Sequence, residues 1–168
     1  MHRPITRTLA LGALVALCIA SLGGPVAAAN PPGNNGTIKV DAQPFDDVPD
    51  NESHPSCVFE VDFYGFDEGA LWATATFTLI SPTGDTDSVF LTSDPVAIGG
   101  DPASGAGTTS GLDASRTFDL NSYLYEYMGA NGKGAHVKLT VHADGATNAD
   151  TKYKTFWVTG CEYPNQET

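Results

Sequence analysis

The chain has 168 residues, of which 20 are Asp or Glu and 8 are Lys or Arg, so its formal net charge is −12 at pH 7. Binding to nucleic acid or to an anionic membrane surface is not expected, because both rest on basic contacts to phosphate. The length fits one domain with its own hydrophobic core. The charge suits a soluble extracellular protein and leaves cationic partners or divalent metals open.

Residues 1–29 are expected to be a secretory signal peptide rather than part of the fold. Arg3 and Arg7 give a positive start, residues 9–22 form an uncharged, mostly apolar run, and three alanines at 27–29 offer a cleavage site. The run is shorter than the roughly 20 residues of a membrane span; a retained anchor is the alternative. Cleavage would remove both arginines, which lowers the net charge from −12 to −14 and leaves no membrane span in the mature chain.

A Pro- and Gly-containing flexible linker is expected at residues 30–36, and β-strands follow it. Apolar and polar residues alternate along four segments, which predicts strands with one buried face at 37–42, 57–64, 71–80 and 135–143. Three weaker strands are expected at 88–98, 115–120 and 152–160. Pro95 makes the first of these bent or places it at a sheet edge, and large residues on both faces of 152–160 leave its inward face open. Residues 121–129 start with Asn-Ser and end at Gly, which predicts a short helix in a connection.

Seven short strands without a long helical segment predict an all-β fold. The expected architecture is an antiparallel two-sheet sandwich of immunoglobulin or fibronectin-III type, with about seven strands. A jelly roll or an open barrel is the alternative. We expect a single domain over residues 37–163, followed by a polar tail at 164–168.

Removal of the signal peptide would remove Cys18 and leave Cys57 and Cys161. In a secreted chain such a pair is expected to form one disulfide, with two free thiols as the alternative. The predicted topology supports the pairing, because the second strand starts and the seventh ends at the same pole of the sandwich. Cys57 is therefore expected to be structural and not a nucleophile.

Acidic residues suggest two sites for Ca²⁺, which prefers oxygen ligands. The connection after the first strand carries Asp46, Asp47, Asp50, Glu52 and His54, but it lacks EF-hand spacing and is more simply a solvated loop. At the opposite pole, three loops should meet and bring carboxylates together, which would repel one another without a cation. That weak calcium candidate comprises Asp67, Glu68, Asp101, Asp113, Asp144 and Asp150; no other cofactor is expected, and dispersed surface charge is the alternative.

Aromatic residues offer a candidate ligand site. Trp72, Tyr123, Tyr125 and Tyr127, with Trp157, would suit a platform for sugar rings, although capping the core or covering the helix connection is the simpler explanation.

The sequence supports catalytic activity less well than ligand binding. Glu60 and Asp62 share one strand face, as do His136 and His142, but alternation alone explains this. No G-x-S-x-G elbow is present, and no catalytic residue is assigned. Lys39 is expected to be an ordinary exposed lysine, since the last strand holds no Asn for a cross-link.

Several segments together resemble a group of short secreted hypothetical proteins from high-GC actinobacteria. They are "NNGTIKVD", "PFDD", "CVFEVDFYGFD", "GLDASRTFDL", "HVKLTV" and "FWVTGC". The group has no assigned activity, so the resemblance implies no catalytic residue. Some members look sortase-anchored, whereas this sequence ends in "CEYPNQET", which favours release into the medium over wall attachment.

The sequence therefore predicts a secreted, non-enzymatic β-sandwich module that acts by binding or as part of the cell envelope. Its partner would be an extracellular protein or glycan. The alternative is a carbohydrate-binding accessory module or a small secreted enzyme.

Overall fold

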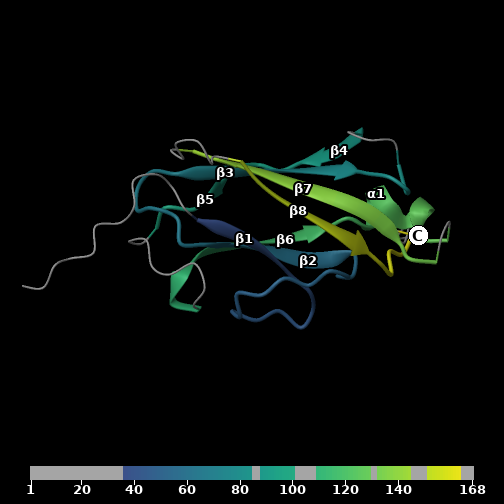
Figure 1. The fold of residues 1–168 in the computed structure, drawn as a ribbon, viewed down its shortest axis with the longest axis horizontal. Coiled ribbons are helices and arrows are strands. Elements are labelled where there is room, and N and C mark those ends of the chain that lie inside the picture. The colour runs from purple at the N-terminus through teal and green to yellow at the C-terminus, as the bar shows by residue number, and fades with distance from the viewer. Residues whose placement is uncertain (1–35, 85–87, 101–108, 130–131, 145–150, 164–168) are drawn as a thin grey trace, which may run out of the picture.

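The computed structural model describes residues 36–84, 88–100, 109–129, 132–144 and 151–163, which form two antiparallel sheets packed face to face (Figure 1). The expected signal peptide, nearly all of the expected linker and the expected polar tail lie outside these ranges. Within them, no helix is long and apolar enough to cross a membrane.

The smaller sheet has three strands in the order β1-β2-β6. These are β1 (Thr37–Asp41), β2 (Val58–Tyr64) and β6 (Leu112–Asp119). Lys39 and Ser115 flank Asp62 on the two neighbouring strands. Ile38, Phe59 and Phe118 point into the molecule, so polar residues at alternate positions point away from it.

The larger sheet has five strands. Four follow the order β4-β3-β7-β8: β4 (Ser88–Thr92), β3 (Trp72–Leu79), β7 (Ala135–Ala143) and β8 (Thr151–Val158). The fifth, β5 (Val96–Ala97), also pairs with β3. Three short helical elements lie in connections: η1 (Thr109–Gly111), α1 (Asn121–Leu124) and η2 (Tyr125–Tyr127).

The inward faces of both sheets build one core around Phe59. Its ring lies 5.4 Å from that of Phe156 and 6.0 Å from that of Phe77 between centroids, both edge to face, a favoured arrangement for buried aromatic pairs. Phe118 completes the cluster, 4.8 Å from Phe77. Since Phe59 and Phe118 come from one sheet and Phe77 and Phe156 from the other, these contacts hold the layers together.

The predicted all-β sandwich is confirmed, with two antiparallel sheets. β1, β2 and β6 in one sheet and β3, β7 and β8 in the other match the grouping of strands A, B, E and C, F, G in immunoglobulin folds. β4, which corresponds to the fourth predicted strand, pairs with β3 in the larger sheet, and an immunoglobulin or fibronectin-III type for the sandwich stays a prediction.

Some strand boundaries differ from expectation. The segment 88–98 splits into β4 and β5 on either side of Pro95, and both pieces pair with β3. Leu112–Ala114 belong to β6, which therefore starts three residues before the strand predicted at 115–120. A register irregularity at Phe63/Tyr64 lets Leu112 pair with Tyr64, which propensity alone does not reveal. The expected helix at 121–129 is confirmed but is broken into α1 and η2.

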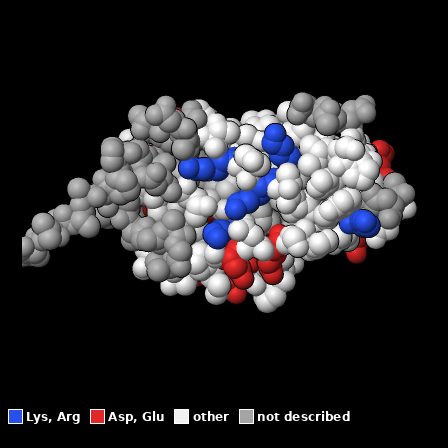
Figure 2. All heavy atoms as spheres, in the orientation of Figure 1, with Lys and Arg blue, Asp and Glu red and all other residues white. Residues whose placement is uncertain are grey.

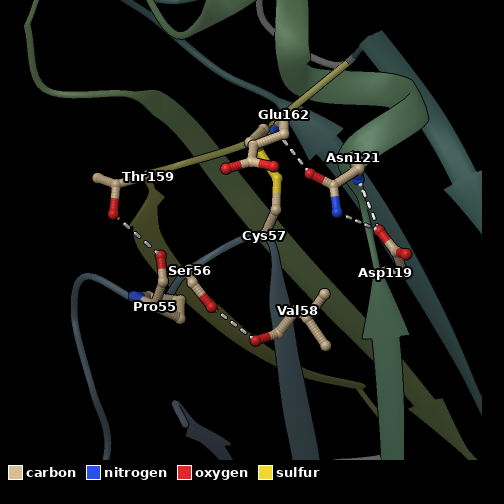
Figure 3. The surroundings of a disulfide bond; sticks show 9 residues. Pro55, Ser56, Cys57, Val58, Asp119, Asn121, Thr159 and Glu162 are labelled. Carbon is tan, nitrogen blue, oxygen red and sulfur yellow. Dashed lines mark hydrogen bonds between the residues drawn. A yellow bond between two sulfur atoms is a disulfide. The ribbon is translucent and has the colours of Figure 1, made fainter. Parts of the chain in front are cut away.

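The disulfide between Cys57 and Cys161 is confirmed, and it joins the start of β2 to the residues after β8 across the two sheets. Polar contacts surround it (Figure 3). Glu162 N–H donates to Asn121 Oδ1, and Asn121 donates from its backbone and side chain to Asp119. In addition, Ser56 and Thr159 form a parallel bridge, and Thr159 N–H donates to the Pro55 carbonyl at 3.0 Å. This end of the sandwich, called the disulfide pole below, is thus closed by covalent and hydrogen bonds.

Candidate functional site

The described ends of the loops expected to meet at the far end lie close together, and we call this end the distal pole. β2 ends there and β3 starts there, and Asp144 N–H donates to the Trp72 carbonyl at 2.8 Å. Asp67, Glu68, Asp113 and Asp144 all belong to this pole, whereas Asp101 and Asp150 lie outside the described residues.

These acids do not converge on one point in the part of the chain that the structure describes. No group of three or more His, Cys, Asp or Glu side chains there is arranged to hold a metal ion. Asp113 instead accepts a hydrogen bond from Phe66 N–H at 2.8 Å, which fixes the turn after β2. The calcium site stays a prediction for the pole as a whole.

The structure does not bring the candidate aromatic residues together in one platform. Tyr123, Tyr125 and Tyr127 follow β6 at the disulfide pole, where Tyr123 packs on Phe90 and Tyr125 on Tyr163. Tyr127 packs against the core. Trp72, by contrast, opens β3 at the distal pole. The three tyrosines therefore cover the connection between β6 and β7 and do not form one surface with Trp72.

A different aromatic surface lies on the outer face of the five-stranded sheet. Trp72 is 48% exposed and Tyr153 is 68% exposed. Trp157 lies on the same face, stacked at 4.5 Å on His136, and Lys138 lies 5.8 Å from the centre of the Tyr153 ring. Threonines fill the positions between them: Thr74, Thr76, Thr140, Thr151 and Thr155. Tyr153 was not among the predicted site residues, because the inward face of its strand was ambiguous in the sequence.

A hollow of about 530 Å³ lies at the distal end of this outer face, beside Trp72. Its lining combines an indole, a hydroxyl, an imidazole and a carboxylate, from Trp72, Thr74, His142 and Asp144, with Pro95 at one side. Thr74 and His142 are cross-strand partners, so the sheet itself spaces them. A mostly apolar hollow with a few fixed polar groups is the usual form of a small-molecule site.

The backbone around the hollow is held by close contacts. Trp72 pairs with Ala97 on β5, and Ile98 N–H donates to the Leu71 carbonyl at 3.0 Å. Gly69 N–H donates to the Gly99 carbonyl, also at 3.0 Å. A Cβ at Gly99 would lie 2.2 Å from the Gly69 carbonyl oxygen, so this approach requires glycine. Trp72 is therefore presented by a fixed scaffold.

The acidic connection between β1 and β2 forms a strap, residues 42–52, over the outer face of the three-stranded sheet. Its anchors are hydrogen bonds: Asp46 N–H to Asp41 Oδ2 at 2.9 Å, Ala42 N–H to Glu52, and the Tyr64 hydroxyl to the Asp47 carbonyl at 3.1 Å. Glu52 in the strap and Asp41 at the end of β1 thus accept hydrogen bonds from backbone N–H groups, as in a structured loop. His54 contacts Ser53, and the disulfide removes Cys57 as a partner for it.

Asp62 lies on the sheet face beneath this strap and is 1% exposed. Neither of its carboxylate oxygens has a hydrogen-bond partner. Burial raises the pKa of Asp62 to about 6, and the nearby Ser115 hydroxyl, which is not in hydrogen-bonding geometry, offsets this only in part. Burial likewise raises the pKa of Asp41, and it raises the pKa of Tyr64 to about 12. In each case the cause is desolvation, which disfavours the charged form of the group.

Charge is unevenly distributed over the face in Figure 2, where Lys and Arg side chains gather across the middle and Asp and Glu along the lower margin. Burial and the neighbouring Lys39 lower the pKa of Lys154. Lys39 and Lys154 therefore lie close together where β1 and β8 adjoin. β1 and β8 are edge strands of their sheets. Charged residues on an edge strand protect it from pairing with strands of other chains. Lys39 was expected to be exposed, but in the structure it is partly buried.

The chain was compared with protein-family models, with curated proteins and with solved structures, and none of these comparisons finds a match.

Proposed function

We propose that the protein is a secreted, non-enzymatic binding module. The observation that carries this proposal is the hollow beside Trp72, set in the outer face of a disulfide-closed sandwich. A half-exposed indole on a fixed backbone loses little conformational entropy on binding and supplies a large apolar contact.

Extracellular location is part of this proposal. The signal-like first 29 residues, the acidic composition and the resemblance to secreted actinobacterial proteins support it, and the disulfide is compatible with it. The module would act in the medium or at the cell envelope, on an extracellular protein or glycan.

A capture experiment tests the binding function. Immobilised protein is incubated with cell-wall and secreted fractions of the producing culture, and the bound material is quantified. Trp72→Ala should lower capture, whereas Val89→Ala, which truncates a 58% exposed residue on β4, should not. Equal capture by the wild type and Trp72→Ala would exclude the hollow as the binding site.

A carbohydrate-binding accessory module is the second candidate. It is favoured by Trp72, Tyr153 and Trp157 on one outer sheet face, because aromatic rings stack on the apolar faces of sugars. A glycan array with the wild type, Trp72→Ala and Tyr153→Ala tests it. Binding that survives both substitutions would remove the aromatic face from consideration.

A further inference from the structure

We infer that the hollow beside Trp72 binds an organic ammonium group, carried by a small amine, a quaternary ammonium compound or a lysine side chain. This inference rests on the proposed binding function and specifies the ligand of the same site.

The hollow places a π-face next to a carboxylate. The Asp144 N–H bond to the Trp72 carbonyl, at 2.8 Å, makes the two residues neighbours on adjacent chain segments. Both line the same hollow, together with Thr74. Trp72 is 48% exposed, so part of the indole surface is available to a ligand.

This combination suits a cation better than other ligands. Tryptophan gives the strongest cation–π contact among the aromatic residues, and a carboxylate supplies the compensating charge and a hydrogen-bond acceptor. The Thr74 hydroxyl adds a second acceptor. Lys and Arg do not occur among the described lining residues, and the carboxylate of Asp144 would repel an anion.

Longer-range electrostatics act in the same direction. The chain carries a net charge of −12, and Asp67, Glu68 and Asp113 belong to the same pole as Asp144. Negative charge at the same pole as the hollow raises the local concentration of cations and the rate at which they arrive. A neutral sugar would gain nothing from this field.

The volume limits the size of the ligand. A hollow of about 530 Å³ is within the usual range for small-molecule sites, roughly 300–1,000 Å³. It accommodates an ammonium headgroup with a short substituent or the end of a lysine side chain, and it leaves the remainder of a larger partner on the open sheet face.

Titrations of the full protein test the inference. Tetramethylammonium, butylammonium, glucosamine, a lysine-containing peptide and neutral glucose are added at constant ionic strength, and tryptophan fluorescence and amide NMR shifts are followed. Because Trp72 and Trp157 are the two tryptophans of the chain, the Trp157→Phe background isolates the Trp72 fluorescence signal, and amide NMR titration of the wild type gives the reference affinity. At least one ammonium ligand should bind at least tenfold more tightly than glucose, and comparison of the four shows which carrier is preferred.

The variants locate the site. Trp72→Ala should abolish saturable binding, Asp144→Asn should weaken it about fivefold or more, and Val89→Ala should have no effect. Glucose binding without ammonium binding would overturn the inference and leave the proposed function intact. If no ligand binds and capture from the culture fractions is also independent of Trp72, both fail.

Discussion

Replacing Asp62 with Asn should remove a pH-dependent loss of stability from the three-stranded sheet. Asp62 is 1% exposed, and neither of its oxygens has a hydrogen-bond partner. Its pKa is raised from 3.8 to about 6, with burial as the main cause. The folded state therefore holds the carboxyl proton more tightly than the unfolded chain does.

The sign and the magnitude follow from this shift. The stabilisation by the bound proton is fully present below about pH 3.8, decreases as the pH rises through about 6, and is lost above that value. At about 1.4 kcal/mol per pKa unit, the full shift corresponds to at most about 3 kcal/mol. Asp62 lies under a strap that is one segment thick, so we expect screening by water to reduce the effect to about 1–2 kcal/mol.

Urea denaturation of the wild type and Asp62→Asn between pH 4 and pH 8 measures the effect. The free energy of unfolding of the variant should gain about 1–2 kcal/mol relative to the wild type over this range, with an unchanged denaturant slope. Asp50→Asn, at an exposed position of the strap, is the matched control and should follow the wild type. A difference between Asp62→Asn and wild type that stays constant from pH 4 to pH 8 would refute the reasoning.

Three further substitutions test other parts of the structure. Joint replacement of Cys57 and Cys161 with Ala should lower the free energy of unfolding by about 2–5 kcal/mol; a change below about 1 kcal/mol would mean that the hydrogen bonds between residues 53–56 and β8 already close this pole. Gly99→Ala should destabilise the protein by about 1–3 kcal/mol and change Trp72 fluorescence, since its Cβ would lie 2.2 Å from the Gly69 carbonyl oxygen. Gly100→Ala, with nothing within 4 Å, is its control, and equal melting temperatures for the two variants would contradict the expected clash. Tyr64→Phe removes a 3.1 Å bond to the strap and should speed amide exchange at Ala42 and Asp46, at a cost of about 0.5–1.5 kcal/mol; unchanged exchange would show that the strap does not depend on Tyr64.

Most of the fold could be predicted from the sequence, because apolar and polar residues alternate along four of its strands. Phe59, Val61 and Phe63 on β2 and Val137, Leu139 and Val141 on β7 are all buried, as the period of two requires. The predictions were wrong where pairing with a neighbouring strand, and not the local sequence, decides the structure. Leu112–Ala114 extend β6 by pairing with Phe63 and Tyr64 of β2, with a register irregularity between these two residues, and this pairing is not encoded in local propensity.

The site was harder to predict for the same reason. β8 carries large residues on both faces, and only its pairing with β7 shows that Tyr153 and Trp157 point outward. Trp72 was a candidate, but its grouping with Tyr123, Tyr125 and Tyr127 ignored the direction of β6, which carries the tyrosines to the opposite pole. The cysteine pairing was predictable, since topology alone brings the ends of β2 and β8 together.

The two poles are stabilised in different ways, and this difference bears on where binding takes place. The disulfide pole is closed by a covalent bond and by backbone pairing between residues 53–56 and β8. The distal pole has no cysteine; its described contacts include the Gly69–Gly99 approach and the Asp144–Trp72 hydrogen bond. These are individually weak interactions, so local opening should cost less free energy at the distal pole than at the disulfide pole. A ligand seated between Trp72 and Asp144 would therefore stabilise the less constrained end of the sandwich, and amide exchange at Asp144 should slow on binding while that at Thr159 should not.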